Sequence, residues 1–121
     1  MKKTILFSLI VLMLLLGCSQ QEKTTPTSTI TISGETTAKT YNIKIENSEF
    51  IPNSITIKRG DTIIWTNTGS VKHTITSDAG DELDSELVAK GQSYSHKFDE
   101  AGEFSYHCTP HPYMKATVIV E

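Results

Sequence analysis

The segment Tyr106-His107-Cys108-Thr109-Pro110-His111-Pro112-Tyr113-Met114 places a thiol, an imidazole and a thioether at the spacing Cys-x2-His-x2-Met. Apolar and polar residues alternate up to Cys108 and again after Met114, which predicts two strands joined by this loop. The loop would turn its three nitrogen and sulfur groups toward one point. A second imidazole, His73, lies upstream. Because loops at one end of a β-sandwich cluster together, we expect the two loops to meet.

Short alternations of the same kind fill the chain from residue 41 to residue 121, separated by glycines that signal turns. This pattern predicts an all-β sandwich or barrel of about seven to eight strands. The only candidate for a helix is Asp81–Lys90. We expect it to form either one or two helical turns or an irregular loop. The residues that alternate with polar neighbours, and so lie on one face of each predicted strand, are Tyr41, Ile43, Ile45, Ile55, Ile57, Ile63, Trp65, Tyr94, His96, Phe98, Phe104, Tyr106, Cys108, Ala116, Val118 and Val120.

Residues 1–17 have the composition of a secretory signal peptide. Met1-Lys2-Lys3 is basic, and the run from Thr4 to Leu16 is almost wholly apolar. That run is shorter than the roughly 18 residues that suggest a membrane-spanning helix. A buried amphipathic helix is the alternative, but the run has no polar face. We therefore predict that the protein is exported and that residues 1–17 are removed.

The end of this signal, Leu15-Leu16-Gly17-Cys18, resembles the lipobox of bacterial lipoproteins, whose cysteine is acylated and becomes the first residue. Two acyl chains are enough for stable anchoring. Residues 18–40 would then be the lipidated cysteine and a Thr/Ser-rich flexible tether, with a short edge strand at Thr29–Ser33 as an alternative. Cleavage elsewhere, with Cys18 incidental, is the competing interpretation. Lipidation of Cys18 would leave Cys108 as a lone thiol in an oxidising compartment.

The charge of the chain is acidic and unevenly distributed. The net charge of −3 becomes −5 when Lys2 and Lys3 leave with the signal (−3 − 2 = −5). This balance argues against nucleic acid as a partner, because nucleic-acid-binding surfaces are basic. A cluster of acids suggests a solvated loop, or alternatively a docking patch for a basic partner. The cluster comprises Asp78, Asp81, Glu82, Asp84 and Glu86.

The four candidate ligands His73, Cys108, His111 and Met114 suit copper. One thiolate with two imidazoles forms a trigonal set, and a thioether is a weak axial ligand, as in electron-transfer copper sites. Zinc prefers cysteine, histidine and carboxylate ligands, c-type haem needs Cys-x-x-Cys-His, and iron–sulfur clusters need more cysteines. Each residue alone has an ordinary structural explanation. Their joint spacing is better explained by one bound copper ion.

The two remaining histidines are not predicted to be ligands. His96 has a structural or surface role in a strand. His107 precedes Cys108, and strand alternation directs its side chain to the opposite face. It is expected to be a surface group, or a partner contact coupled to the site through the Cys108 backbone.

The chain from Tyr41 to Glu121 resembles the cupredoxin family, and most of all its amicyanin and plastocyanin branch. The short Cys-x2-His-x2-Met loop is the amicyanin form. This resemblance implies a Greek-key β-sandwich, one type 1 (blue) copper and one-electron transfer between redox partners. It also implies that His73, Cys108 and His111 are equatorial ligands and Met114 the axial one. The residues that carry it are Gly60-Asp61, Ile63-Ile64-Trp65, His73, Gly102-Glu103-Phe104-Ser105-Tyr106 and Cys108-Thr109-Pro110-His111-Pro112-Tyr113-Met114.

Two positions depart from the family pattern. Many members have asparagine directly after the first ligand histidine, where it ties the two ligand loops together. Thr74 stands at that position, and its hydroxyl is expected to make a similar bond. Tyr113 stands where amicyanins often have phenylalanine.

We further expect a backbone N–H of Thr109 or Met114 to donate a hydrogen bond to the Cys108 sulfur. His111 is expected to present a ring edge at the surface as the electron port.

Together these features predict an exported, monomeric, lipid-anchored electron carrier that faces the periplasm or the cell exterior and exchanges electrons with redox proteins. The alternative is a cell-surface copper carrier or scavenger with the same ligands, but such proteins often have Met- or His-rich tracts, which are lacking here. We do not expect an enzyme. Copper oxidases and nitrite reductases need a second copper centre, for which only His96 and His107 remain.

Overall fold

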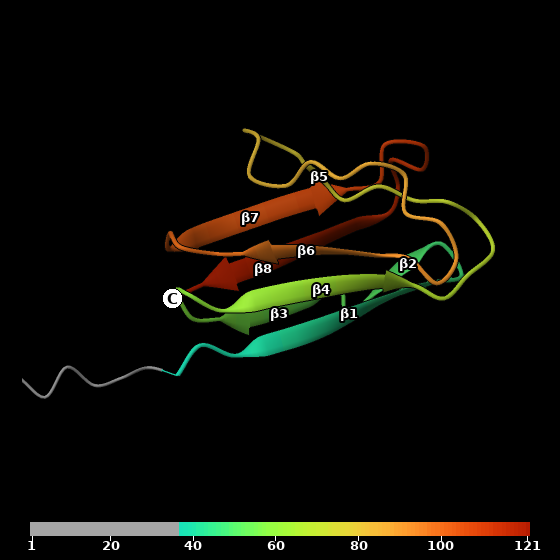
Figure 1. The fold of residues 1–121 in the computed structure, drawn as a ribbon. Helices are drawn as coiled ribbons and strands as arrows, with labels where there is room; N and C mark the ends of the chain where they lie inside the picture. Colours follow the sequence, from blue (N-terminus) through green and yellow to red (C-terminus); the bar gives the residue numbers. More distant parts are fainter. Residues whose placement is uncertain (1–36) are drawn as a thin grey trace, which may run out of the picture. The chain divides into compact units, whose positions relative to one another are not determined.

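The computed structural model describes residues 37–121, which form eight strands in two four-stranded sheets (Figure 1). One sheet has the order β2-β1-β4-β6, made of Glu49–Ile51, Thr40–Glu46, Thr62–Asn67 and Ser93–Lys97. The other has the order β3-β8-β7-β5, made of Ser54–Ile57, Lys115–Val120, Gly102–His107 and Thr76–Ser77. The predicted all-β sandwich is confirmed. Within residues 37–121, no helix is long and apolar enough to cross a membrane.

Three of the sequence predictions fall outside the described residues. These are the signal peptide at 1–17, the lipidated Cys18, and the tether as far as residue 36, including the alternative strand Thr29–Ser33.

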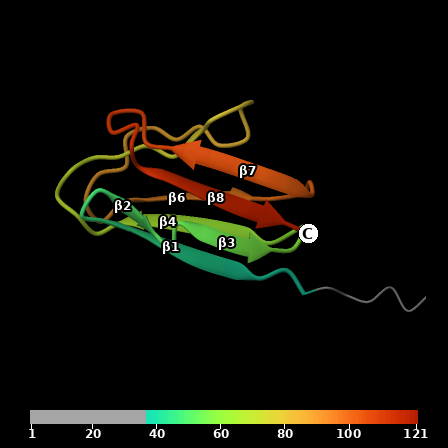
Figure 2. The same cartoon turned by 180° about the vertical axis from the view of Figure 1, so that it is seen from behind.

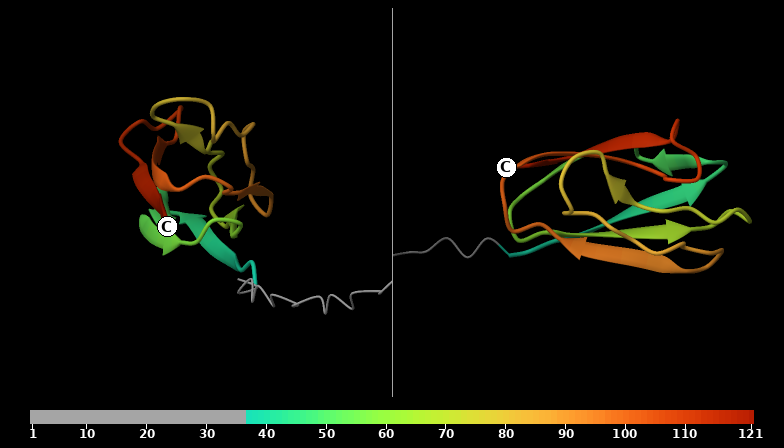
Figure 3. Two further views of the ribbon diagram at one scale, coloured as in Figure 1. Left: turned by 90° about the vertical axis from the view of Figure 1, so that its left-hand side faces the viewer. Right: turned by 90° about the horizontal axis from the view of Figure 1, so that it is seen from above.

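The strand connections bring the loops after β4 and β7 to one end of the sandwich, opposite the carboxyl end of the chain (Figure 1). The chain crosses between the sheets repeatedly, as in a Greek-key sandwich. Strand β1 pairs with β4, and β3 with β8, in parallel, whereas the other pairs are antiparallel. Figure 2 shows β3 and β8 running in the same direction, and Figure 3 shows the strands of both sheets lying roughly along one direction.

The inward faces of the strands form the core, as the alternation predicts. At its centre the indole N–H of Trp65 donates to the Tyr106 hydroxyl at 3.0 Å, and the two rings meet edge to face. Burial raises the pKa of Tyr106, so this hydroxyl stays protonated. Tyr106 lies two residues before Cys108, so the bond anchors the end of β7 that leads into the predicted ligand loop.

The segment Asp81–Lys90 forms an irregular arm, one of the two predicted alternatives, and no helix. Its backbone bonds to residues 73–77 instead of to itself, with single bridges from Val88 to His73 and from Asp84 to Thr76. The Ser85 hydroxyl also accepts the N–H of Ile75 at 2.7 Å. These hydrogen bonds satisfy backbone N–H and C=O groups that would have bonded to each other in a helix. The arm therefore covers the strand segment that follows His73.

Asp61 joins three segments at the opposite end of the sandwich. Its carboxylate accepts the backbone N–H of Lys39 at 2.7 Å and of Lys58 at 2.9 Å. Its carbonyl accepts the N–H of Phe98 at 2.9 Å. The two bonds to the carboxylate hold the pKa of Asp61 below its ordinary value. Asp61 therefore connects the residues just before β1 to the turn between β3 and β4.

We expect Asp61→Asn to lower the denaturant midpoint at pH 7, because an amide offers one acceptor where two N–H groups now donate. A carboxyl whose folded pKa is lowered stabilises the fold above its unfolded pKa of about 3.9, and this contribution is lost as the pH falls through the folded value. The difference between wild type and variant should therefore shrink near pH 3. Urea unfolding at both pH values tests this, with the exposed Asp99→Asn as control. Equal midpoints at pH 7 would contradict it.

Candidate metal site

The loop between β7 and β8 carries three of the predicted ligands on two successive tight turns. The antiparallel ladder ends at the pair His107 and Lys115, so Cys108 follows the last paired residue of β7. The N–H of His111 donates to the Cys108 carbonyl at 3.1 Å, and the N–H of Met114 to the His111 carbonyl at 2.9 Å. The N–H of Cys108 returns to the Met114 carbonyl at 3.1 Å. These three bonds hold Cys108, His111 and Met114 around one small loop.

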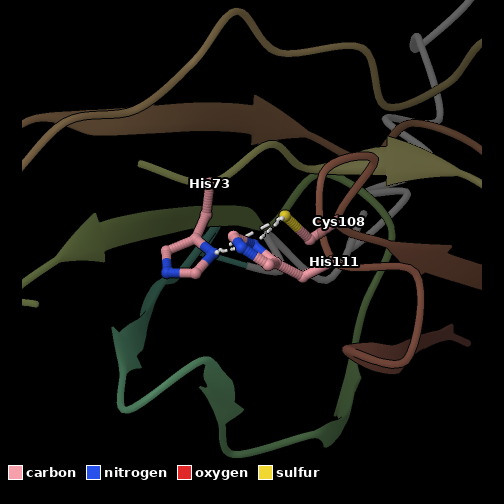
Figure 4. Close-up of side chains that lie close together, drawn as sticks. All are labelled: His73, Cys108 and His111. Atoms are coloured by element: carbon pink, nitrogen blue, oxygen red, sulfur yellow. Dashed lines mark hydrogen bonds between the residues drawn. The ribbon is translucent and has the colours of Figure 1, made fainter. Parts of the chain in front are cut away.

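The structure brings His73 from the loop after β4 onto Cys108 and His111, as Figure 4 shows. The Cys108 Sγ lies 3.5 Å from the Nδ1 of His73 and 3.6 Å from the Nδ1 of His111. The two Nδ1 atoms are 3.2 Å apart. Cys108 and His73 are buried, and His111 is half-buried. Met114 is buried at the end of the same loop.

This donor set fits a copper ion. The thiol and the two imidazoles turn one lone-pair atom each toward a common point, and the buried thioether of Met114 lies in the same loop. Burial lowers the pKa of His73, and the neighbouring His111 lowers it further. A lowered pKa keeps the His73 imidazole neutral at physiological pH, which is the form that binds a metal.

Thr74 makes the contacts that support the sulfur. Its backbone N–H donates to the Cys108 Sγ at 3.4 Å, and its hydroxyl accepts the Thr109 N–H at 2.8 Å. The expectation that the Thr74 hydroxyl ties the two loops together is confirmed. The expectation that Thr109 or Met114 donates to the sulfur is wrong. The Thr109 N–H donates to the Thr74 hydroxyl, and the Met114 N–H donates to the His111 carbonyl.

Asn67 is a buried positioning residue that the sequence reasoning missed. Its side-chain NH2 donates to the carbonyls of Val71 at 2.7 Å and Val88 at 2.9 Å. Its side-chain oxygen accepts the N–H of Gly69 at 2.9 Å. The amide therefore shapes the loop from β4 to His73 and joins it to the irregular arm. The available signal was its position: Asn67 continues the inward-facing series of Ile63 and Trp65.

The other two histidines lie apart from this cluster and pair with carboxylates. His107 Nδ1 contacts the Asp78 carboxylate at 2.5 Å, and its absence from the cluster agrees with the alternation. His96 Nε2 contacts the Glu82 carboxylate at 2.6 Å and its ring packs edge-on against Phe98. Two members of the acidic cluster, Asp78 and Glu82, thus have histidine partners.

Two prolines and a tyrosine flank His111 in the loop. Tyr113 is 72% exposed, and the prolines on either side of His111 are also exposed. The Tyr113 ring meets the His111 ring edge to face at 6.1 Å. His73 and Cys108 are buried, whereas His111 is half-buried. His111 is therefore the member of the cluster that lies nearest the exposed surface.

Comparison with known proteins gives consistent matches over this domain. A family model described as copper binding proteins, plastocyanin/azurin family, matches residues 37–121. The amicyanin of Paracoccus versutus is 34% identical over 110 residues, which cover 87% of this chain and 83% of that protein. Plastocyanin of Scenedesmus fuscus is 41% identical over 85 residues, covering 60% of this chain and 86% of that protein.

Solved structures show the same similarity. The crystal structure of amicyanin from Paracoccus versutus superposes with a TM-score of 0.64 at 36% identity, covering 68% of this chain and 81% of that one. A reduced Cu(I) form of an amicyanin mutant superposes with a TM-score of 0.63 at 34% identity, covering 68% of this chain and 82% of that one. The fold therefore has counterparts in solved amicyanin structures, one of which is described as a reduced Cu(I) form.

Proposed function

Because this chain belongs to the plastocyanin/azurin family of copper-binding proteins, we propose that it carries single electrons between redox proteins, using one type 1 copper held by His73, Cys108, His111 and Met114. The observation that carries this proposal is the convergence of one sulfur and two imidazole nitrogens, separated by 3.2 to 3.6 Å, at one end of the sandwich. When bound, copper supplies the Cu(I)/Cu(II) couple that takes up and releases one electron.

The residues of this chain prepare the site for such a couple. The Thr74 N–H stabilises negative charge on the Cys108 sulfur. Burial keeps water from the sulfur and from His73. Because the hydrogen bonds of both loops are already formed around the donors, the geometry need change little between the two charge states. Low reorganisation favours electron transfer.

His111 supports electron exchange with a partner. It is a half-buried ligand surrounded by exposed prolines and Tyr113, so a partner pressed against this face would lie close to the donor cluster. The amicyanins and plastocyanins to which the chain is similar are the models for this role. We propose no catalytic activity, because copper oxidases and nitrite reductases need a second copper centre, for which only His96 and His107 remain beside the proposed ligands.

We infer export through the signal at residues 1–17, acylation of Cys18, a tether to residue 40 and a monomeric copper domain at 41–121, facing the periplasm or the cell exterior. The sequence of the lipobox supports the anchor. Mass spectrometry of the amino terminus tests it, with acylated Cys18 expected and any other first residue contradicting it.

Copper loading tests the proposed function. One equivalent of Cu(II) added to the purified metal-free protein should give an intense blue absorption, which a one-electron reductant bleaches and an oxidant restores. Rapid, reversible voltammetry at an electrode is the second expected result. A protein that binds only Cu(I), stays colourless and does not reoxidise would indicate the carrier or scavenger alternative. Absence of the blue band would overturn the electron-carrier proposal.

A further inference from the structure

Three threonine hydroxyls form a closed ring between the two ligand loops. The Oγ1 of Thr74 lies 2.9 Å from that of Thr76, and the Oγ1 of Thr76 lies 3.0 Å from that of Thr109. The ring closes through the backbone N–H of Thr109, which donates to the Thr74 Oγ1 at 2.8 Å. Thr74 is buried, Thr76 is half-buried and Thr109 is exposed. The ring thus leads from beside the sulfur to the surface.

Donor counting assigns a direction to this ring. A hydroxyl has one hydrogen to donate and two lone pairs that accept. The Thr74 oxygen accepts the Thr109 N–H, so its own hydrogen needs an acceptor, and Thr76 is the one that the described contacts provide. Thr76 then donates to the Thr109 hydroxyl, whose hydrogen reaches solvent. The reverse direction would leave the hydrogen of Thr74 buried without a partner, which is costly.

We propose that Thr76 is a positioning residue for the metal site, acting through the Thr74 hydroxyl; the inference rests on the proposed copper function. By accepting the hydrogen of Thr74, Thr76 fixes the lone pair that Thr74 presents to the Thr109 N–H. Thr74 follows His73, and Thr109 follows Cys108. Fixing Thr74 against Thr109 therefore sets His73 against Cys108, and it aims the Thr74 N–H at the sulfur.

A competing explanation is that backbone pairing alone holds the loops. Thr76 belongs to β5, and its backbone pairs with that of His107. Thr76→Val separates the two explanations, because valine keeps the branched shape and the strand preference but removes the hydroxyl. Thr76→Ser restores a hydroxyl on the same backbone. Thr56→Val, at an exposed position of β3, removes a hydroxyl on another strand and serves as the control.

The first measurement is hydrogen exchange of the Thr109 amide in the metal-free protein. Thr76→Val should speed this exchange about two- to tenfold, the effect of weakening one hydrogen bond. Thr76→Ser should recover most of the protection, and Thr56→Val should leave it within about twofold of wild type. Unchanged Thr109 exchange in Thr76→Val, or acceleration that Thr76→Ser does not reverse, would overturn the proposal.

The second measurement uses the copper-loaded protein. Thr76→Val should change the reduction potential and the position or width of the sulfur-to-copper band, whereas Thr76→Ser and Thr56→Val should stay close to wild type. Identical potentials and spectra in all four proteins would overturn the role at the metal. Because the exchange experiment needs no copper, a wild-type protein that never turns blue would refute the proposed function and not the hydroxyl ring.

Discussion

Replacing Cys108 with serine is expected to abolish the intense blue absorption of the copper-loaded protein. The band requires a thiolate bound to Cu(II), and Cys108 is the only cysteine within residues 37–121. A serine hydroxyl is a hard oxygen donor that stays protonated near neutral pH, so it does not replace a soft thiolate. We expect complete loss of the band, and copper binding weakened by at least about tenfold. Visible spectroscopy and competition with a copper chelator measure the two effects.

His107→Gln is the matched control for this substitution. His107 adjoins Cys108 in sequence, but its ring contacts Asp78. The blue band should persist in this variant, because the ring is no ligand. Far-ultraviolet circular dichroism should show that Cys108→Ser keeps its strands. A blue band that survives Cys108→Ser, or one that His107→Gln abolishes while the fold is intact, would refute the assignment of the ligand loop.

Replacing Asn67 with aspartate is expected to destabilise the metal-free protein by about 2–4 kcal/mol at pH 7. The change keeps the size of the side chain but converts the NH2 donor into an acceptor that faces the carbonyls of Val71 and Val88. It also buries a charge that has no cation among its described contacts. The deficit should shrink as the pH falls toward 5, because a protonated carboxyl regains one donor and its folded pKa is raised.

Asn42→Asp is the control, since Asn42 is exposed on the outer face of β1. It should change the free energy of unfolding by no more than about 0.5 kcal/mol. Urea unfolding of both variants with the metal removed measures the difference. We also expect Asn67→Asp to weaken copper binding, because the two hydrogen bonds that the Asn67 NH2 group donates near the His73 loop are lost. If Asn67→Asp lowers the free energy of unfolding by less than about 1 kcal/mol, or if Asn42→Asp lowers it equally, the Asn67 amide does not shape this loop.

The His73 loop is therefore held from two sides. Asn67 secures the chain before His73, and the hydroxyls of Thr74 and Thr76 secure the chain after it. Both arrangements are networks in which a buried polar residue, Asn67 or Thr74, has a partner for each of its side-chain donors. Such networks are rigid when satisfied and costly when broken. A copper site that must serve two charge states gains from ligands that are already in place before the metal binds.

Most of the strands and the proposed ligand residues could be predicted from the sequence because both depend on local patterns. Alternation with a period of two shows which residues face inward wherever one face of a strand is buried. It placed Trp65, Tyr106 and Cys108 in the core, and the structure agrees. The spacing of Cys108, His111 and Met114 lies within one loop, so their proximity needs only the turn between two strands. The residue types alone then favoured copper.

Pairing between distant segments was decided only in three dimensions. The parallel pairs β1–β4 and β3–β8, and the irregular course of Asp81–Lys90, depend on partners far away in the chain. The same is true of the donor to the sulfur. Thr74 is adjacent to His73, yet its N–H reaches Cys108, 34 residues away, only because two loops meet. A hydrogen bond needs its partner within about 3.5 Å in the right direction. The sequence therefore determined most of the strands and the residues proposed as metal donors, and the tertiary structure decided which groups hold those residues in place.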